Sequence, residues 1–192
     1  MKAVLDACVL FPTVLREILA DVAGAGLFQP VWSQRILDEW RIAAGRQGLS
    51  AGVEIALLQD RFPKASVSPS GGAEGLDLPD DADRHVIEAA LASGAKTIVT
   101  ANLRDFPRAP LAALGLQAIH PDEFLREFYL NHPDPVADAV RATETRARNA
   151  GGAMSRKELM RRARLPRLAK AMERLAGSDV AMQHYGHKSA DR

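Results

Sequence analysis

Residues 78–107 read LPDDADRHVIEAALASGAKTIVTANLRDFP, and three structural signals follow one another within this stretch. Carboxylates cluster at its start, where Asp80, Asp81 and Asp83 precede apolar residues at helical spacing that end at Gly94. A short apolar strand, TIV, comes next and opens into a polar loop. Acids at a helix start, followed by polar groups at a strand end, predict a site that gathers carboxylates.

Other strand ends carry polar residues of the same kind. Asn102 and Asp105 lie in the loop after TIV, and Asp6 directly follows an apolar run at residues 2–5. Further strand patterns at residues 27–32, 65–67 and 116–119 alternate with helical patterns. This alternation predicts a mostly parallel sheet in a three-layer α/β/α fold. Because ligands bind beyond the carboxyl ends of parallel strands, these polar residues are expected to meet there.

Helical phase separates two neighbouring acids on the second helix of the chain. This helix is predicted to begin after an N-cap at Ser33 and to bury Ile36. Glu39 lies about 60° from Ile36 around the helix, whereas Asp38 lies roughly opposite. Glu39 is therefore the acid that is expected to point inward.

The helix after the acid cluster is read in the same way. Asp83 shares its apolar face, and His85 lies about 200° further round, so we expect His85 to face solvent without a catalytic role. Asp80 and Asp81 are interpreted as helix caps rather than ligands. Thr100, at the strand end, is either a hydroxyl that polarises an acid or an ordinary strand residue.

Carboxylates gathered at one spot require compensation. At about 4 Å and an effective dielectric constant near 20, one such pair costs on the order of 4 kcal/mol. Oxygen ligands without His or Cys suit Mg²⁺ or Mn²⁺ better than Zn²⁺. Such ions polarise phosphodiesters and acidify water, which is the logic of metal-dependent phosphoryl transfer.

Four segments, in this order, resemble the PIN domain, which is the nuclease fold of VapC-type toxins in toxin–antitoxin pairs. They are VLDACVL around Asp6, ILDEW around Glu39, DRHVIEAAL opening with Asp83, and TIVTANLRDF with Asn102 and Asp105. The later IHPDEFL is similar to the family's last strand and helix, so the resemblance covers about residues 1–130.

The resemblance implies a Mg²⁺- or Mn²⁺-dependent endoribonuclease with a partner antitoxin. The implied metal ligands and catalytic acids are Asp6, Glu39, Asp83 and Asp105, and Asn102 lies in the implied strand-end pocket. Some relatives carry an acid where this chain has Asn102, so the number of bound metals stays open.

Charge divides the chain into an acidic body and a basic extension. Residues 141–174 carry 11 Lys or Arg and 3 Glu, or +8, which leaves 14 bases and 21 acids, or −7, elsewhere. We predict a nuclease domain at residues 1–130 and a basic helical extension at 131–192. The extension could grip RNA phosphates, dock the antitoxin, or be a solvated appendage. Between residues 136 and 177 it has no aromatic residue for base stacking.

Composition adds limits on the environment. Cys8 is the only cysteine, which excludes an internal disulfide and a cysteine-rich metal site, and we expect it to be a small buried residue. The chain shows neither a signal peptide nor a membrane span of roughly 20 apolar residues. A cytoplasmic location without membrane contact is therefore expected. Oligomeric state stays open, a homodimer included.

Two other classes of function compete with the nuclease. A haloacid-dehalogenase-type phosphatase needs a second Asp two residues after its nucleophile, and Asp6-Ala7-Cys8 lacks it. A PIN fold with a degraded site could bind RNA or protein without cutting. Four inward acids argue against that alternative.

Overall fold

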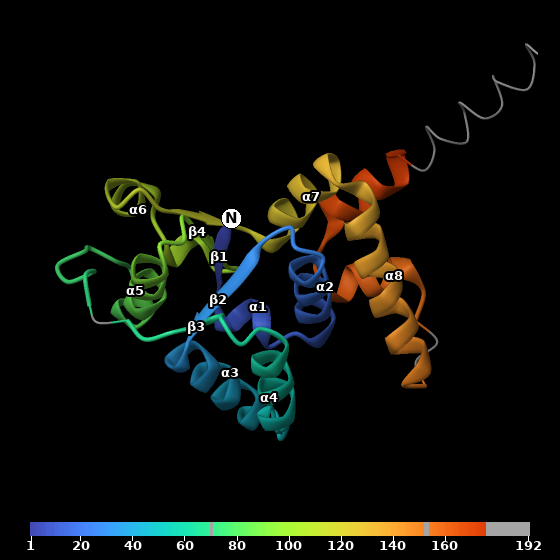
Figure 1. Ribbon diagram of the computed structural model, residues 1–192, viewed down its shortest axis with the longest axis horizontal. Helices are drawn as coiled ribbons and strands as arrows, with labels where there is room; N and C mark the ends of the chain where they lie inside the picture. Colours follow the sequence, from blue (N-terminus) through green and yellow to red (C-terminus); the bar gives the residue numbers. More distant parts are fainter. Residues whose placement is uncertain (70, 152–153, 176–192) are drawn as a thin grey trace, which may run out of the picture.

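The computed structural model describes residues 1–69, 71–151 and 154–175, and Figure 1 shows their arrangement. Within these residues, five parallel strands form one sheet in the order β3-β2-β1-β4-β5. The strands are β1 (Lys2–Leu5), β2 (Gln29–Ser33), β3 (Ser66–Val67), β4 (Thr97–Val99) and β5 (Gln117–Ile119). The strand order reverses between β1 and β4, and binding sites of open parallel sheets lie at such switch points.

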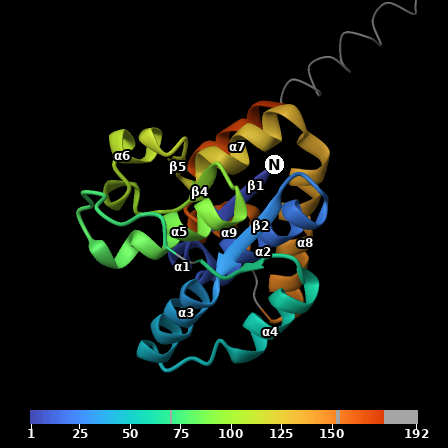
Figure 2. The ribbon, with the colours of Figure 1, turned by 60° about the vertical axis from the view of Figure 1, so that its left-hand side comes forward.

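Helices cover both faces of this sheet, as the predicted three-layer α/β/α fold requires. The helices of the body are α1 (Ala7–Leu10), α2 (Thr13–Gly24), α3 (Gln34–Arg46), α4 (Gly52–Arg61), α5 (Arg84–Ser93), α6 (Arg108–Ala113) and α7 (Pro121–Asn131). Two short 3₁₀ turns, η1 (Asp81–Asp83) and η2 (Leu103–Asp105), lie in loops. Helix α5 packs on one face of the sheet and α2 on the other, with α7 and α8 (Pro133–Asn149) on the same side as α2 (Figures 1 and 2).

Local signals in the sequence explain where several elements begin and end. The hydroxyl of Ser33 accepts a hydrogen bond from the amide of Ile36 at 3.3 Å, which confirms the predicted N-cap of α3. Gly94 ends α5 at φ 70°, a left-handed conformation that glycine adopts without a steric penalty. Strand β4 has the predicted bounds, because its buried residues continue the apolar run.

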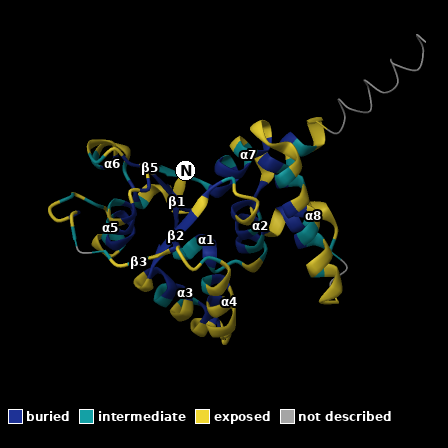
Figure 3. Ribbon diagram, viewed as in Figure 1, coloured by how far each residue is buried: buried dark blue, intermediate teal, exposed yellow. Residues whose placement is uncertain are grey.

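The core lies on both sides of the sheet. Strands and the inner faces of the helices are buried, whereas the outer faces of α3, α4 and α8 are largely exposed (Figure 3). Phe28 packs edge-to-face on Phe124 with ring centroids 5.0 Å apart, and Phe128 contacts both rings. This aromatic group fixes α7 against the start of β2.

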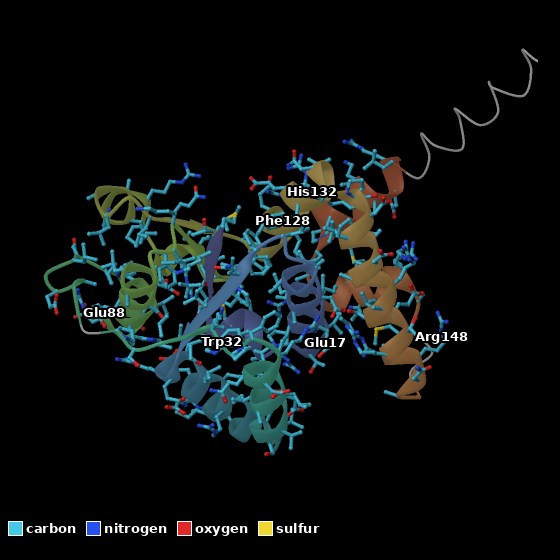
Figure 4. The ribbon with its side chains drawn as sticks, viewed as in Figure 1. Glu17, Trp32, Glu88, Phe128, His132 and Arg148 are labelled. Atoms are coloured by element: carbon cyan, nitrogen blue, oxygen red, sulfur yellow. The ribbon has the colours of Figure 1, made fainter. Side chains whose placement is uncertain are left out.

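The basic extension packs against the body. It contains α8 (Pro133–Asn149), α9 (Arg156–Arg162) and a further helical run at 166–175, so the predicted helix break at Leu165-Pro166 is confirmed. Helix α8 lies along α2 and α7, and buries Val136 and Val140. Arg146 of α8 forms ion pairs with Glu17 and Asp21 of α2, at 2.7 and 2.5 Å; Figure 4 shows Glu17 at this junction.

Asp122 joins the last described helical run to α7. Its buried carboxylate accepts hydrogen bonds from the backbone amides of Arg167 at 3.0 Å and Leu168 at 2.9 Å. These amides open the helical run and have no partners within it, so Asp122 acts as their cap from another element.

The division into domains at residue 130 stays a prediction. In the described residues, no helix has the length and apolarity that crossing a membrane requires.

Candidate active site

Two neighbouring strands bring the first candidate residues together. Leu5 of β1 and Val99 of β4 are register partners, so Asp6 and Thr100 occupy the next positions at the same edge of the sheet. The Asp6 amide donates to the carbonyl of Val99 at 3.2 Å and extends the ladder by one bond. Asp6 is only 5% exposed. The polar side chains that directly follow these two strands, Asp6 and Thr100, therefore lie side by side.

Two side chains hold the carboxylate of Asp6 in one orientation. The Thr100 hydroxyl donates to Oδ2 of Asp6 at 2.7 Å, and the Cys8 thiol donates to the same atom at 3.1 Å. Burial, and then the charge of Asp6, raise the pKa of the Cys8 thiol to about 12, so it stays a protonated donor. Within the described residues, no hydrogen bond reaches Oδ1, which leaves that oxygen to a ligand.

The positioning contacts of Cys8 and Thr100 were not resolved by the sequence. Cys8 was expected to be a small buried residue; it is half-buried and contacts Asp6. For Thr100 the structure supports the reading in which its hydroxyl contacts an acid. The available signal was positional, since Thr100 follows β4 as Asp6 follows β1.

Asp83 reports the electrostatic environment of the edge. It closes η1 directly before α5, and its pKa is raised to about 6. Partial burial is the largest cause, and the negative charges of Asp6, Asp105, Asp80 and Glu39 follow. Three of the predicted acids, Asp6, Glu39 and Asp105, therefore lie close enough to the fourth, Asp83, to raise its pKa.

Glu39 and Asp38 diverge as the helical phase predicts. Oε1 of Glu39 lies 2.8 Å from Nε2 of His85 and 3.7 Å from Nε of Arg35. Asp38 instead pairs with Arg41 at 2.5 Å and accepts a hydrogen bond from Gln34 at 3.0 Å, all on α3. Only Glu39 of this pair contributes to the field at Asp83.

The prediction that His85 faces solvent is wrong. Its side chain is 4% exposed and lies against Glu39. Helix α5 contacts the sheet on one side and α3 on another, so it is buried over more than one face. A single apolar stripe could not reveal the second buried side, because that side depends on a neighbouring helix.

The loop after β4 places Asp105 deeper than Asn102. Asp105 ends η2 with its side chain 19% exposed and lies 3.6 Å from the exposed Arg104. Asn102 is exposed, and its backbone amide donates to the Thr100 hydroxyl at 3.0 Å. Asn102 is thus more exposed than the region of Asp6, Glu39, Asp83 and Asp105, which we call the acidic edge.

The two acids interpreted as caps have local partners. Oδ1 of Asp80 accepts a hydrogen bond from the amide of Ala82 at 2.8 Å, which caps η1 as predicted. Asp81 forms an ion pair with Arg84, whose guanidinium also donates to the carbonyl of Leu76 at 3.1 Å. Asp81 is thereby linked to the residue that ties the preceding loop to α5.

The donor set of the edge fits a hard divalent cation. Asp6, Glu39, Asp83 and Asp105 supply oxygen atoms only, while the high pKa of the Cys8 thiol makes sulfur a poor ligand. The pKa of Asp83 is raised first by its burial and then by the negative charges of the neighbouring acids. As the side chains stand, no three acidic, histidine or cysteine residues of the described ranges are close enough to hold one ion.

A groove lies on the extension, away from these acids. It has a volume of about 1340 Å³ between α7, α8, α9 and the helical run at 166–175. Its apolar lining includes Ala137, Met160 and Met172, and its rim includes Lys157 and Lys170. None of the four acids lines it, so its volume says nothing about the acidic edge.

Sequence comparison agrees with this fold. The model of the PIN domain matches residues 2–104, and the chain therefore belongs to the PIN domain family. A protein of Mycobacterium tuberculosis (strain ATCC 25618 / H37Rv) named "Putative ribonuclease VapC50" is 49% identical over 43 residues. That match covers 22% of this chain and 25% of the relative's length. No solved structure matches the chain.

Proposed function

We propose that this protein is a metal-dependent endoribonuclease and the toxin of a toxin–antitoxin pair. The observation that carries the proposal is that Asp6, Glu39 and Asp105 lie close enough to Asp83, near the switch point of a PIN domain, for their charges to raise its pKa. A 43-residue likeness to a relative named as a ribonuclease supports RNA as the substrate. An antitoxin partner is expected from the VapC-type resemblance alone.

The four acids would hold Mg²⁺ or Mn²⁺. When bound, such an ion stabilises charge on the phosphodiester and acidifies the attacking water. Asp6 presents Oδ1, because Thr100 and Cys8 already occupy Oδ2. Either the ion or a proton must relieve the repulsion around Asp83. One carboxylate of the set takes the proton that water loses during the attack.

The extension supplies the positive charge that the body lacks. We assign RNA phosphate contacts to those of its basic side chains that form no ion pair with a described residue. Lys157, Arg164 and Lys170 line the groove and have no ion pair with any described residue. Contacts of this kind are electrostatic and do not depend on sequence.

A protein partner is the competing use of this surface. The groove has an apolar floor that includes Met160 and Met172, and phosphates do not need such a floor. Methionine side chains adapt to apolar partners, which favours docking of the antitoxin here. Salt dependence of RNA binding separates the two uses, as described in the Discussion.

Two other readings remain as outcomes of the test. A PIN domain with a degraded site would bind RNA without cutting it. The phosphatase reading has lost support, because the chain belongs to the PIN domain family and lacks the second Asp after Asp6. We also propose a cytoplasmic location.

Cleavage of a long single-stranded RNA by the purified chain tests the proposal. We expect internal cuts in millimolar Mg²⁺ or Mn²⁺ and none in EDTA. Metal should also raise the melting temperature, since an ion at 100 times its Kd stabilises by about 2.7 kcal/mol. Metal-induced stabilisation without cleavage would indicate a binding module. Absence of both stabilisation and cleavage would reject the metal site. Sequencing the neighbouring open reading frame, and co-expressing its product with this chain if it encodes a small DNA-binding protein, tests the antitoxin.

A further inference from the structure

One buried polar side chain beside the acidic edge is not explained by the proposed function. His85 is 4% exposed, and neither of its ring nitrogens has an aligned hydrogen-bond partner among the described residues. Nε2 nevertheless lies 2.8 Å from Oε1 of Glu39, which is hydrogen-bond distance. The distance and the missing alignment are compatible, because the terminal torsion of a glutamate is soft and can bring the oxygen into the plane of the ring.

Burial makes this contact matter. A buried imidazole is costly unless its N–H has an acceptor, and Glu39 is the acid that lies beside it. The other base near Glu39 is Arg35, whose side chain is 58% exposed and whose Nε is 3.7 Å away. His85 is thus the closer and better fixed of the two donors.

The same helix start carries a second acid. Asp83 precedes α5 and His85 is its second residue, so one rigid turn relates their positions. Helix α3, which carries Glu39, contacts α5. A donor at His85 can therefore set the place of Glu39 relative to Asp83.

We propose that His85 is a positioning residue that holds the Glu39 carboxylate toward the acidic edge. The inference rests on the proposed function, since His85 would hold Glu39, a ligand of that same metal site. Nε2 donates its proton to Oε1 of Glu39, and Oε2 stays available to the ion. Nε2 carries a proton in one neutral tautomer and in the charged ring, so the role does not require His85 to titrate. A partly exposed glutamate such as Glu39 would otherwise sample several rotamers.

Direct measurement of Mn²⁺ affinity tests this role. His85→Leu keeps an apolar volume but removes the donor, and it should weaken Mn²⁺ binding by roughly 10-fold, the low end for lost outer-shell partners. RNA cleavage should fall at low Mn²⁺ and recover at high Mn²⁺, with KM for RNA unchanged. His85→Gln retains an N–H donor near the Nε2 position and should restore most of the affinity.

A double-mutant cycle identifies the partner. In the Glu39→Gln background, His85→Leu should cost no further Mn²⁺ affinity. Independent losses would show that His85 acts elsewhere and would overturn the inference. Unchanged affinity in His85→Leu would reduce His85 to packing.

A second pair of variants covers the case in which His85→Leu does not fold. His85→Gln and His85→Asn are both amides, but only Gln is long enough to reach Glu39. Equal Mn²⁺ affinity in the two would overturn the inference. If the wild-type protein itself neither binds Mn²⁺ nor cuts RNA, the proposed function fails and this inference fails with it. Normal wild-type binding with an unaffected His85→Leu rejects the inference alone.

Discussion

Carboxylates face one another on the acidic edge, whereas carboxylates face guanidinium groups on the extension. The pKa of Asp83 is raised to about 6 by burial and by its acidic neighbours. The pKa of Glu158, on α9, is lowered to about 2 by hydrogen bonds from Arg161 and Arg162. Both regions are rich in charge, but the carboxylate of Asp83 lies among other acids, whereas the carboxylate of Glu158 is paired with guanidinium groups.

Unbalanced charge is the better guide to function. A paired acid such as Glu158 is explained by the structure around it, and its partners lie on the same helix. Clustered acids destabilise the fold that gathers them, so an external cation is needed to account for them. On the extension, the corresponding excess is positive and lies on Lys157, Arg164 and Lys170.

The largest expected effect is loss of cleavage when the edge loses an acid. Asp6→Asn or Asp83→Asn should lower kcat/KM for RNA by at least about 100-fold, which corresponds to about 2.7 kcal/mol of transition-state stabilisation. The matched control is Asp81→Asn, since Asp81 is exposed and paired with Arg84. Comparable cleavage by all three folded variants would refute the site.

A smaller effect is expected for Glu39, which reaches the edge from a helix. Glu39→Gln should cost roughly 10- to 100-fold in cleavage. Asp38→Asn should change cleavage less than about twofold, because Asp38 pairs with Arg41 on the outside of α3. Initial rates at fixed Mg²⁺ compare the two, and equal losses would mean that the inward acid has been misidentified.

The basic surface can be tested without removing it. Truncation after residue 131 would expose the buried side of α2, since α8 covers it, so charge removal is the cleaner change. Lys157→Gln, Lys170→Gln and Arg164→Asn together should make the slope of log affinity against log salt shallower by about 2. Each phosphate contact on a single strand contributes roughly 0.7 to this slope, and three contacts are removed. Asn is chosen because Arg164 has φ 56°.

The outcome separates RNA binding from partner docking. The triple variant should keep the metal-dependent rise in melting temperature, which shows that the edge is intact. An unchanged salt slope with loss of inhibition by the antitoxin would assign the groove to the protein partner. RNA affinity is measured in EDTA so that cleavage does not interfere.

The smallest effect is the opposite pH dependence of stability in the two regions. In metal-free protein, Asp83 has a folded pKa of about 6, above its unfolded value, so its contribution to stability falls as pH rises from about 4 to about 6. Asp83→Asn should remove this fall. Glu158 has a folded pKa of about 2, below its unfolded value, so its contribution is present above about pH 4 and is lost toward pH 2.

Melting temperatures of the wild type, Asp83→Asn and Glu158→Gln across pH 2–7 in chelator measure both effects. The Glu158 effect should be slight, because that side chain is solvated. If Asp83 instead made the wild-type protein more stable as pH rises from about 4 to about 6, its neighbours could not be negatively charged.

Much of the fold follows from signals that act over a few residues. The Ser33 cap, the Gly94 end of α5 and the bounds of β4 depend on neighbours in the sequence, and all three were predicted. The strand-end positions of Asp6 and Asp105 follow from the alternation of strands and helices. Local patterns therefore suffice for the candidate acids.

The supports of the site depend on contacts across the fold. Thr100 reaches Asp6 only because β4 adds beside β1, and His85 is buried only because α3 lies against α5. The short helix α1, which directly follows Asp6, was also not predicted. Likewise, the attachment of the extension through Asp122 and Arg146 pairs residues that are far apart in sequence.

The neighbouring positions of β1 and β4 have a consequence for the nascent chain. Ribosomes add roughly 5–20 residues per second, so β4 and Thr100 emerge roughly 5 to 20 s after Asp6. During that interval β1 can pair with β2 but not with β4, and Asp6 lacks the hydroxyl of Thr100. A polypeptide interrupted before β4 carries separate acids and no assembled edge, so translation itself delays the appearance of the site.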